Sequence, residues 1–530
     1  MQVRVQIDEQ GALRNQRYAF SDRYTLISEL MQNARRAGAT KVCIDYDAQY
    51  KKLKVSDDGC GIADFQKLMT FNDSGWDKET CTEERPFGIG FSKCLYSASR
   101  CIVRSLGRQV DFLTNSALEQ SWIDVTTVDT EPGTQITLYD VDLPFLEKRI
   151  FELAEGFAIP VIFNSQDVPR PHAADALPYI ETEIGRIWLK GTDDGESTRD
   201  TVIYLQGFCV RKPLYHYQAN QLLCNVVHLD SKRFTARLPD RDQLIDEDEQ
   251  KVIIDQTIKA CWREVLMEKK STLPAVDFVD RFLPTLRTWG HIDLLNDVPV
   301  LPRQLCKRIV DYPYQEGMSD RDYLSIVDKH ITRETVEQGG ETLIDLDDTN
   351  EDNMAYWMYA WARNFVVFDN YLADGHWVNK HVRSLENNER VIEIVTEQCR
   401  AEFSSRWIWP TVVICESYAI TIGGVRVEID DVALYHGALA IIPRHEVSGA
   451  VCGQISDYID ENDQHFQDDR EADMDALLTL IRRLRAVDPE STMRSLLAEL
   501  ALEKYPLLQG KTFTVLVGDK PDAHGITLVA

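Results

Sequence analysis

Apolar and polar residues alternate in short runs over the first third of the chain. Residues 1–10 alternate in this way, which predicts a strand. A helical period follows, with Ser21 and Asp22 as candidate N-cap residues for a helix through about Ala37. The runs KVCIDYD and KKLKVSD then predict two strands joined by a short polar turn. Residues 69–86 contain Gly, Asp, Ser and Thr without periodicity, which is typical of a mobile loop.

A second helix is expected from about Gly90, followed by alternating strands to about Phe163. The prolines of NSQDVPRPHAADALP interrupt this pattern, so we expect a first domain over residues 1–165. A second domain is expected over residues 179–270. It contains the strand patterns RIWLKG, TVIYLQGFCVRK and CNVVHLDSKRFTARL, and then a helix from about Asp246.

The pattern is weaker over residues 271–530, for which we expect an α+β region. QGGETLIDLDDTNEDN is typical of an exposed acidic loop, and a long helix is expected around Tyr356–Phe368. A hairpin is expected across Gly423 and Gly424, paired helices over 471–504, and a final strand in TFTVLVG. The whole chain is therefore expected to be an α+β protein.

Composition and charge restrict the classes of function. The 58 Lys plus Arg and 86 Asp plus Glu give a net charge of −28, which disfavours binding to nucleic acid and to anionic lipid. The start of the chain lacks the order of a signal peptide, and no window has 18 consecutive apolar residues, so no membrane span is expected. Twelve cysteines without a Cys-x-x-Cys pair fit a reducing cytosol, and we expect a cytoplasmic protein.

The first motif with chemical potential is ELMQNARRAGAT. Glu29 and Asn33 are four residues apart on the expected helix, so both project from one face. A carboxylate there suits a general base that activates water. The amide oxygen of Asn33 is a hard ligand that suits Mg²⁺ bound to phosphates. The alternative is a solvated helix face.

A second motif, VSDDGCGI, follows an apolar strand. The carboxylate of Asp57 at the end of that strand suits a hydrogen bond from the exocyclic amine of adenine. Gly59 and Gly61 let the backbone approach a flat ring without a Cβ clash. The alternative is an ordinary turn, which this pattern often forms.

Two further glycine motifs follow. Gly88 and Gly90 in RPFGIGFSKC precede a helix start, where backbone N–H groups favour phosphate oxygens. Lys93 in the first turn is a candidate phosphate contact, although such a lysine is more often exposed to solvent. Thr134 follows Gly133 and is a candidate to complete the adenine site through water. Each of these motifs is weak evidence alone.

Together, over residues 18–140, the four motifs resemble those of the GHKL superfamily, which includes DNA gyrase, heat-shock-protein-90 chaperones, histidine kinases and MutL. Glu29 and Asn33 resemble its N-box; AGAT and DDGCGI are most similar to MutL, and FGIGF to heat-shock-protein-90. The resemblance implies a Bergerat-type sandwich of helices on a mixed sheet that binds ATP and Mg²⁺, with residues 69–86 as a lid. The chain departs from the family at Arg36, where an Asp is usual.

The second domain adds a candidate cation for the γ-phosphate. LPDRDQLIDEDE resembles the chaperone middle-domain loop, which implies this role for Arg241. Lys232 in HLDSKRF is the MutL-like alternative. For either residue, the alternative to a phosphate contact is an ordinary surface ion pair in a charged loop.

The resemblance implies a slow ATPase with a chaperone-like or remodelling cycle that acts on protein clients. It also implies a homodimer in which residues 1–10 cross to the partner. One alternative is a MutL-like or topoisomerase-like ATPase that acts on DNA. Another is a non-hydrolysing, ATP-gated binding protein similar to phage rIIA proteins.

Overall fold

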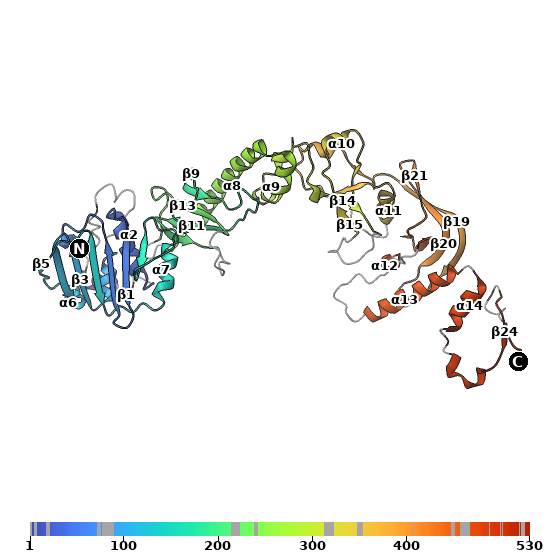
Figure 1. Cartoon of the computed structure of the whole chain (residues 1–530), viewed down its shortest axis with the longest axis horizontal. Coiled ribbons are helices and arrows are strands. Elements are labelled where there is room, and N and C mark those ends of the chain that lie inside the picture. The colour runs from blue at the N-terminus through green and yellow to red at the C-terminus, as the bar shows by residue number, and fades with distance from the viewer. Residues whose placement is uncertain are drawn as a thin grey trace. The chain divides into compact units, whose positions relative to one another are not determined.

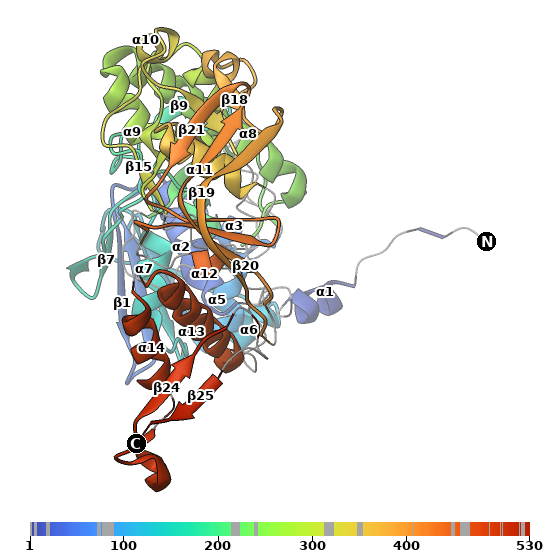
Figure 2. The same cartoon turned by 90° about the vertical axis from the view of Figure 1, so that its right-hand side faces the viewer.

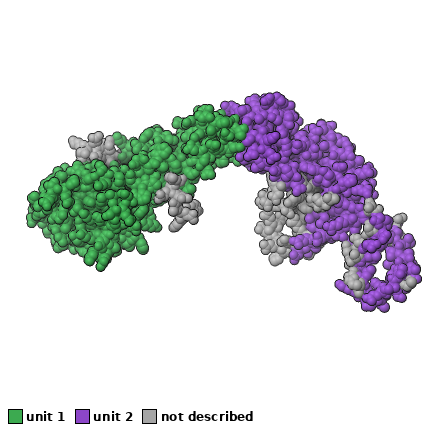
Figure 3. Space-filling view, viewed as in Figure 1, with its two compact units in different colours: residues 1–294 green, residues 295–530 purple. Residues whose placement is uncertain are grey.

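The protein, represented by a computed structural model, is a mixed α+β protein (Figures 1 and 2). It forms two compact units, residues 1–294 and 295–530 (Figure 3). Within the described part of the chain, no helix combines the length and apolar character needed to cross a membrane. The structure describes residues 3–4, 8–16, 18, 22–71, 76, 90–213, 223–237, 242–311, 323–346, 353–405, 408–446, 451–455, 467–486, 488–498, 500, 502–518, 520 and 525–529.

The first unit begins with an eight-stranded sheet in the order β5-β4-β3-β6-β2-β1-β7-β8. Neighbouring strands are antiparallel except β1 and β7, which are parallel. The strands predicted in KVCIDYD and KKLKVSD are confirmed as β1 and β2. The strands are β1 (Val42–Asp47), β2 (Lys52–Asp57), β3 (Arg100–Ser105), β4 (Arg108–Leu113), β5 (Val125–Thr127), β6 (Thr134–Tyr139), β7 (Val161–Phe163) and β8 (Gln166–Asp167).

Helix α2 (Thr25–Arg36) packs its apolar face against this sheet. The face is built by neighbouring turns of the helix, because residues three or four apart lie on one side. Leu26, Ile27, Leu30 and Met31 are all almost completely buried there. The helix predicted to end near Ala37 is therefore confirmed. The other helices of this layer are α3 (Phe65–Met69), α5 (Ser92–Ser97), α6 (Thr114–Leu118) and α7 (Leu146–Ala154).

The strand expected over residues 1–10 is wrong at its end, where Glu9 begins helix α1 (Glu9–Gln16). The carboxylate of Asp8 accepts a hydrogen bond of 3.1 Å from the N–H of Gly11, so it caps the first turn. This local cap and the helix-forming residues that follow outweigh the short alternation. Most of residues 1–7 lie outside the described residues.

A second sheet in the first unit has the order β12-β11-β13-β10-β9. The run TVIYLQGFCVRK, expected as one strand, is a hairpin that turns at Gln206 and Gly207 with φ of +55° and +86°. Apolar residues on both sides of the turn concealed it in the sequence pattern. The strands are β9 (Ile180–Thr182), β10 (Gly185–Trp188), β11 (Thr201–Leu205), β12 (Phe208–Arg211) and β13 (Asn225–Leu229).

The helix expected from Asp246 is confirmed as α8 (Glu247–Thr272). It packs against α9 (Ala275–Trp289), and the rings of Trp262 and Trp289 stack between the two helices with centroids 6.3 Å apart. The expected boundary between residues 270 and 271 falls within α8, and the first unit continues to Leu294. The finer division of this unit into 1–165 and 179–270 stays a prediction.

The second unit contains two five-stranded sheets and a two-stranded one. The first has the order β15-β14-β17-β16-β18; the next has β19-β20-β23-β22, with β21 also on β20. The strands are β14 (Cys306–Ile309), β15 (Leu324–Ile326), β16 (Leu343–Asp345), β17 (Val366–Phe368), β18 (Val382–Ser384), β19 (Arg390–Glu402), β20 (Thr411–Ile422), β21 (Val425–Ile429), β22 (Leu434–His436), β23 (Leu439–Pro443), β24 (Phe513–Leu516) and β25 (Gly525–Leu528). The helices are α10 (Arg333–Glu337), α11 (Met354–Ala362), α12 (Val451–Gln454), α13 (Gln467–Leu484) and α14 (Pro489–Ala498).

Two predictions for this unit are wrong in part. The acidic stretch expected as an exposed loop contains β16, in which Leu343 and Ile344 are completely buried. The helix expected around Tyr356–Phe368 ends at Ala362, because Asn364 takes φ of +54° and the chain continues as β17. The hairpin at Gly423 and Gly424, two helices in the region of 471–504 and the strand in TFTVLVG are confirmed, whereas the pairing of the two helices stays a prediction.

Candidate functional site

The candidate site is built along one face of α2. Glu29, Asn33 and Ala37 lie four residues apart along it, and the rise of a helix separates the first from the last by about 12 Å. Glu29 is buried, with 8% of its surface exposed, and Asn33 is half-buried. The expectation that Asp22 is the N-cap residue is wrong, because α2 begins at Thr25 with Tyr24 as its N-cap residue; the carboxylate of Asp22 instead accepts a hydrogen bond of 2.9 Å from the N–H of Tyr24. Ser21 lies outside the described residues.

The loop after β2 contacts the C-terminal end of this face. A Cβ atom added to Gly59 would lie 2.6 Å from the Cβ of Ala37 and 3.0 Å from Oδ1 of Asp57. The N–H of Gly59 donates to Oδ1 of Asp57 at 2.9 Å, and the N–H of Cys60 donates to the carbonyl of Ala37 at 2.9 Å. Only glycine fits this approach, which holds the Asp57 carboxylate beside the end of α2.

Thr134 lies next to Asp57, because the two residues are register partners on β6 and β2. Gly133 makes the approach possible: it has φ of +73°, and a Cβ there would lie 1.9 Å from the carbonyl oxygen of Asp57. Burial raises the pKa of Asp57, and backbone hydrogen bonds from Gly59 and Thr134 partly offset this effect. Asp57, Gly59 and Thr134 are thus brought together.

Ser105, at the end of β3, joins these elements and was missed from the sequence. It is buried, accepts a hydrogen bond of 2.8 Å from the N–H of Ile62, and donates one of 2.8 Å to the carbonyl of Gly133. Its hydroxyl lies 3.4 Å from that of Thr134. A Cβ atom added to Gly61, which has φ of +77°, would lie 2.8 Å from the same hydroxyl oxygen. A single serine at a strand end has no sequence signal, because its partners come from three separate segments.

Gly90 contacts the other end of the α2 face. A Cβ atom added to Gly90 would lie 2.3 Å from Oε2 of Glu29, so the backbone passes directly against this carboxylate. The helix expected near Gly90 begins at Ser92 as α5, which packs against α2 and contains the buried Lys93. Gly88 and most of the predicted lid over residues 69–86 lie outside the described residues.

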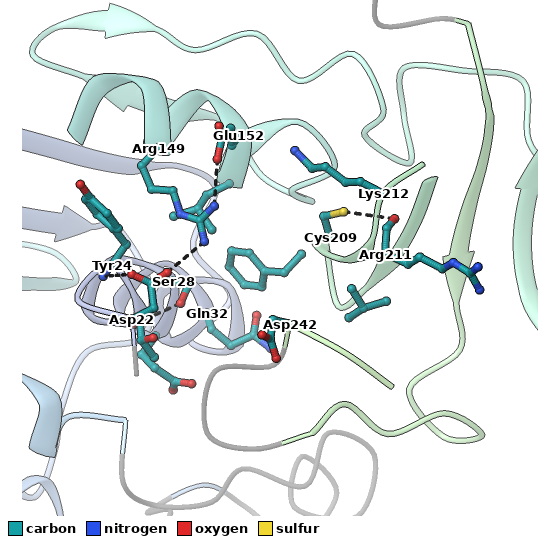
Figure 4. A pocket seen from close by; sticks show the side chains of 15 residues that line it. Asp22, Tyr24, Ser28, Gln32, Arg149, Glu152, Cys209, Arg211, Lys212 and Asp242 are labelled. Atoms are coloured by element: carbon teal, nitrogen blue, oxygen red, sulfur yellow. Dashed lines mark hydrogen bonds and ion pairs between the residues drawn. The ribbon is translucent and has the colours of Figure 1, made fainter. Parts of the chain in front are cut away.

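A cavity of about 220 Å³ lies between α2, α7 and β12 (Figure 4). Arg149 of α7 extends toward the start of α2, where its guanidinium pairs with Asp22 at 3.1 Å, and it also pairs with Glu152 of its own helix at 2.8 Å. Asp57 and Thr134 do not line this cavity, whereas Glu29 does. The lining residues are Asp22, Tyr24, Thr25, Ser28, Glu29, Gln32, Arg149, Glu152, Leu153, Phe208, Cys209, Val210, Arg211, Lys212 and Asp242.

The hairpin turn of the second sheet docks on the first sheet at this cavity. Nε2 of Gln32 donates to Oε1 of Gln206 at 2.5 Å. Phe208 is buried in the core of the first sheet, with its ring centroid 5.2 Å from that of Phe157. The second sheet therefore contacts α2 directly, three residues after Glu29.

Of the two candidate cations, Arg241 and Lys232, the structure describes only Lys232. Arg241 lies outside the described residues, although the next residue, Asp242, lines the cavity together with Glu29. Lys232 is exposed in the turn after β13 and does not line the cavity. Because β11 and β13 are parallel, this turn leaves the sheet at the same edge as Gln206.

The described residues contain no group of three or more His, Cys, Asp or Glu side chains that is arranged to hold a metal ion. Asn33, predicted as the Mg²⁺ ligand, is half-buried on α2 between Glu29 and Ala37, and it does not line the cavity that Glu29 lines. A cation at Asn33 would therefore take most of its ligands from phosphate and water.

The comparisons with known proteins leave the family open. No protein-family model matches the chain, and a search of curated proteins finds no match. The likeness to the GHKL superfamily therefore stays an expectation from the sequence motifs.

Proposed function

We propose that the chain binds Mg-ATP along the α2 face defined by Glu29, Asn33 and Ala37, and hydrolyses it. One observation supports this most strongly: the two glycine loops contact opposite ends of a single helix face. Gly59 lies against Ala37, Gly90 lies against Glu29, and about 12 Å of helix separates the two contacts. This length suits a nucleotide with its base at one end and its terminal phosphate at the other.

At the base end, Asp57 accepts a hydrogen bond from the exocyclic amine of adenine. Its backbone is fixed by the β2–β6 register with Thr134, and its Oδ1 by the N–H of Gly59. Gly59 packs against Ala37 and Gly133 against the carbonyl of Asp57, so these two glycines fix the backbone on both sides of the Asp57 carboxylate. The hydroxyls of Ser105 and Thr134 complete the polar edge.

At the phosphate end, Glu29 orients and deprotonates the attacking water as general base. Its burial against Gly90 holds the carboxylate in place. The amide oxygen of Asn33, one turn along, would hold Mg²⁺, which supplies neutralising charge to the phosphate oxygens. Lys93, buried on the adjacent helix α5, adds a positive charge from the side of the glycine loop.

The second sheet supplies the remaining cation in this proposal. Lys232 and Arg241 are both retained as candidates: the turn of Lys232 shares a sheet edge with Gln206, and Asp242 beside Arg241 lines the cavity with Glu29. Contact of the second sheet with α2 then links the state of the phosphates to the position of that sheet. Such coupling supports a chaperone-like or remodelling cycle, and the net charge of −28 disfavours DNA as the client.

The test is equilibrium binding of ATP and its turnover, both measured with and without Mg²⁺. Glu29→Gln should retain binding and reduce turnover to background, whereas Glu152→Gln, which removes another carboxylate of the cavity, should retain activity. Asp57→Asn should weaken the preference for ATP over GTP. The matched control is Asp58→Asn, because the Asp58 carboxylate accepts the N–H of Thr40 at 2.7 Å instead.

Each outcome separates the candidate functions. Absence of saturable ATP binding contradicts the proposal. Binding without turnover in the unsubstituted protein supports the ATP-gated binding protein. If the unsubstituted protein hydrolyses ATP, Lys232→Ala and Arg241→Ala identify the cation. Only replacement of the residue that contacts the phosphate should lower turnover by orders of magnitude.

A further inference from the structure

One buried polar atom in the wall of the cavity between α2, α7 and β12 has no partner among the described residues. Gln32 is 1% exposed, and its Nε2 donates to Oε1 of Gln206. The atom that remains is its own Oε1, an acceptor that no described donor reaches. In Figure 4 the side chain of Gln32 extends from α2 into the cavity, toward Asp242. Because a buried acceptor without a donor lowers stability, the cavity suits a molecule that supplies an N–H or O–H group.

The charged side chains around the cavity indicate which kind of donor suits it. The two lining carboxylates outside the ion pairs of the lining cations are Glu29 on α2 and Asp242. Together with the partners of the cations, six carboxylates surround three cations, so the cavity has an excess of negative charge. Each lining cation has a carboxylate partner, and the pairs are Arg149–Asp22, Arg149–Glu152, Arg211–Glu247 and Lys212–Glu155.

The cavity has room for a small organic molecule. Its volume of about 220 Å³ exceeds the roughly 150 Å³ that holds benzene in a protein interior, and it is below the roughly 300 Å³ of the smallest drug-sized pockets. Leu153, Phe208 and Val210 form an apolar part of the wall, against which a short carbon chain can pack. A single water molecule would reach Gln32 but would leave most of the volume and the negative charge unmatched.

We propose that this cavity binds a small organic cation, a primary ammonium on a short apolar chain. An ammonium group has three donors and no acceptor, so it matches Oε1 of Gln32 and the carboxylates of Glu29 and Asp242. The carbon chain packs beside Phe208. This site is independent of the proposed ATP site, because binding of the ammonium needs no nucleotide.

Equilibrium dialysis of n-pentylammonium against the full chain, without nucleotide, tests the site. The buffer holds potassium chloride at about 0.15 M, which screens the general attraction of a chain with a net charge of −28 and offers an inorganic cation as competitor. We expect a single saturable site per chain. n-Pentanol, which has as many heavy atoms but no charge, should bind about tenfold more weakly or less, and pentanoate should not bind.

Two variants change different walls of the cavity. Gln32→Met removes the acceptor but keeps the length of the side chain, and it should raise the dissociation constant of pentylammonium by about tenfold or more. Asp242→Asn changes an exposed position that the fold tolerates, and it should raise the constant by about fivefold. The matched control is Glu181→Gln, which removes one exposed negative charge from a described residue that does not line the cavity and should leave binding unchanged.

The outcomes are distinct. Saturable binding that Gln32→Met and Asp242→Asn weaken, and that Glu181→Gln does not, supports the proposal. Absence of saturable binding overturns it, because the cavity then holds water only. Equal affinity for pentanol also overturns it, as does equal weakening by all three variants, which indicates non-specific attraction to a negative chain. ATP binding is measured on separate samples without the amine, so failure of the proposed ATP site leaves this result unchanged.

Discussion

The side-chain amides of Gln32 and Gln206 meet across the boundary between the two sheets of the first unit, with Nε2 of Gln32 2.5 Å from Oε1 of Gln206. Gln32 lies in the middle of α2, between Glu29 and Asn33, and Gln206 lies at the tip of the β11–β12 turn. A displacement of the second sheet therefore changes a contact of α2, the helix that positions both Glu29 and Asn33.

Replacement of Gln206 by alanine should destabilise the first unit by about 1–3 kcal/mol, because the buried amide of Gln32 loses its acceptor. If α2 holds the site, turnover should also fall, whereas ATP binding at the Asp57 end should change little. Urea unfolding and steady-state kinetics measure the two effects. Gln206→Gly removes the same amide but tolerates φ of +55°, so it should be more stable than Gln206→Ala. Equal stability of the unsubstituted protein and both variants would show that the contact contributes nothing.

The contact between Gly90 and Glu29 predicts a pairwise effect. Gly90→Ala should lower stability, because the new Cβ would lie 2.3 Å from Oε2 of Glu29 and one of the two must move. Glu29→Ala removes the carboxylate that the methyl group meets. The double variant should therefore be more stable than the sum of the two single changes predicts, by about 0.5–3 kcal/mol. Additive changes in the free energy of unfolding would contradict this geometry, whatever the protein binds.

Much of the site's framework follows from local patterns in the sequence. The apolar period of α2 is continuous over three turns, and apolar and polar residues alternate in β1 and β2 on either side of a polar turn. Each local pattern therefore predicts the secondary structure of its own segment. The pairing of Asp57 with Thr134 is different, because it depends on strands more than seventy residues apart whose register no local pattern records.

Two of the errors have a common physical cause, which is tertiary burial that outweighs composition. Leu343 and Ile344 stand among acidic residues, yet parallel pairing on both sides buries them as β16. The Gln206 turn was hidden because Phe208, just beyond it, is buried in the core of the other sheet. Neither environment is visible in the neighbouring sequence.

Phe208 should determine whether the two sheets of the first unit unfold together. It belongs to the second sheet, but its ring packs beside Phe157 in the core of the first. Phe208→Ala should cost about 3–5 kcal/mol, and it should separate the calorimetric transition of the first unit into two. Phe145→Ala is the matched control, because Phe145 is 86% exposed and should cost little. A single unshifted transition in Phe208→Ala would show that Phe208 does not couple the unfolding of the two sheets.

His376 should make the stability of the second unit sensitive to acid. Its side chain is 2% exposed, its Nδ1 accepts the N–H of Val378 at 3.1 Å, and burial lowers its pKa to about 4 from the ordinary 6.5. The unfolded chain binds the proton more readily, so the contribution of neutral His376 is fully present above pH 6.5 and is lost as the pH falls toward 4. His376→Asn removes this titration. The difference in unfolding midpoint between the unsubstituted protein and His376→Asn should therefore shrink from pH 7.5 to pH 4.5, which thermal unfolding at several pH values measures; a constant difference would contradict it.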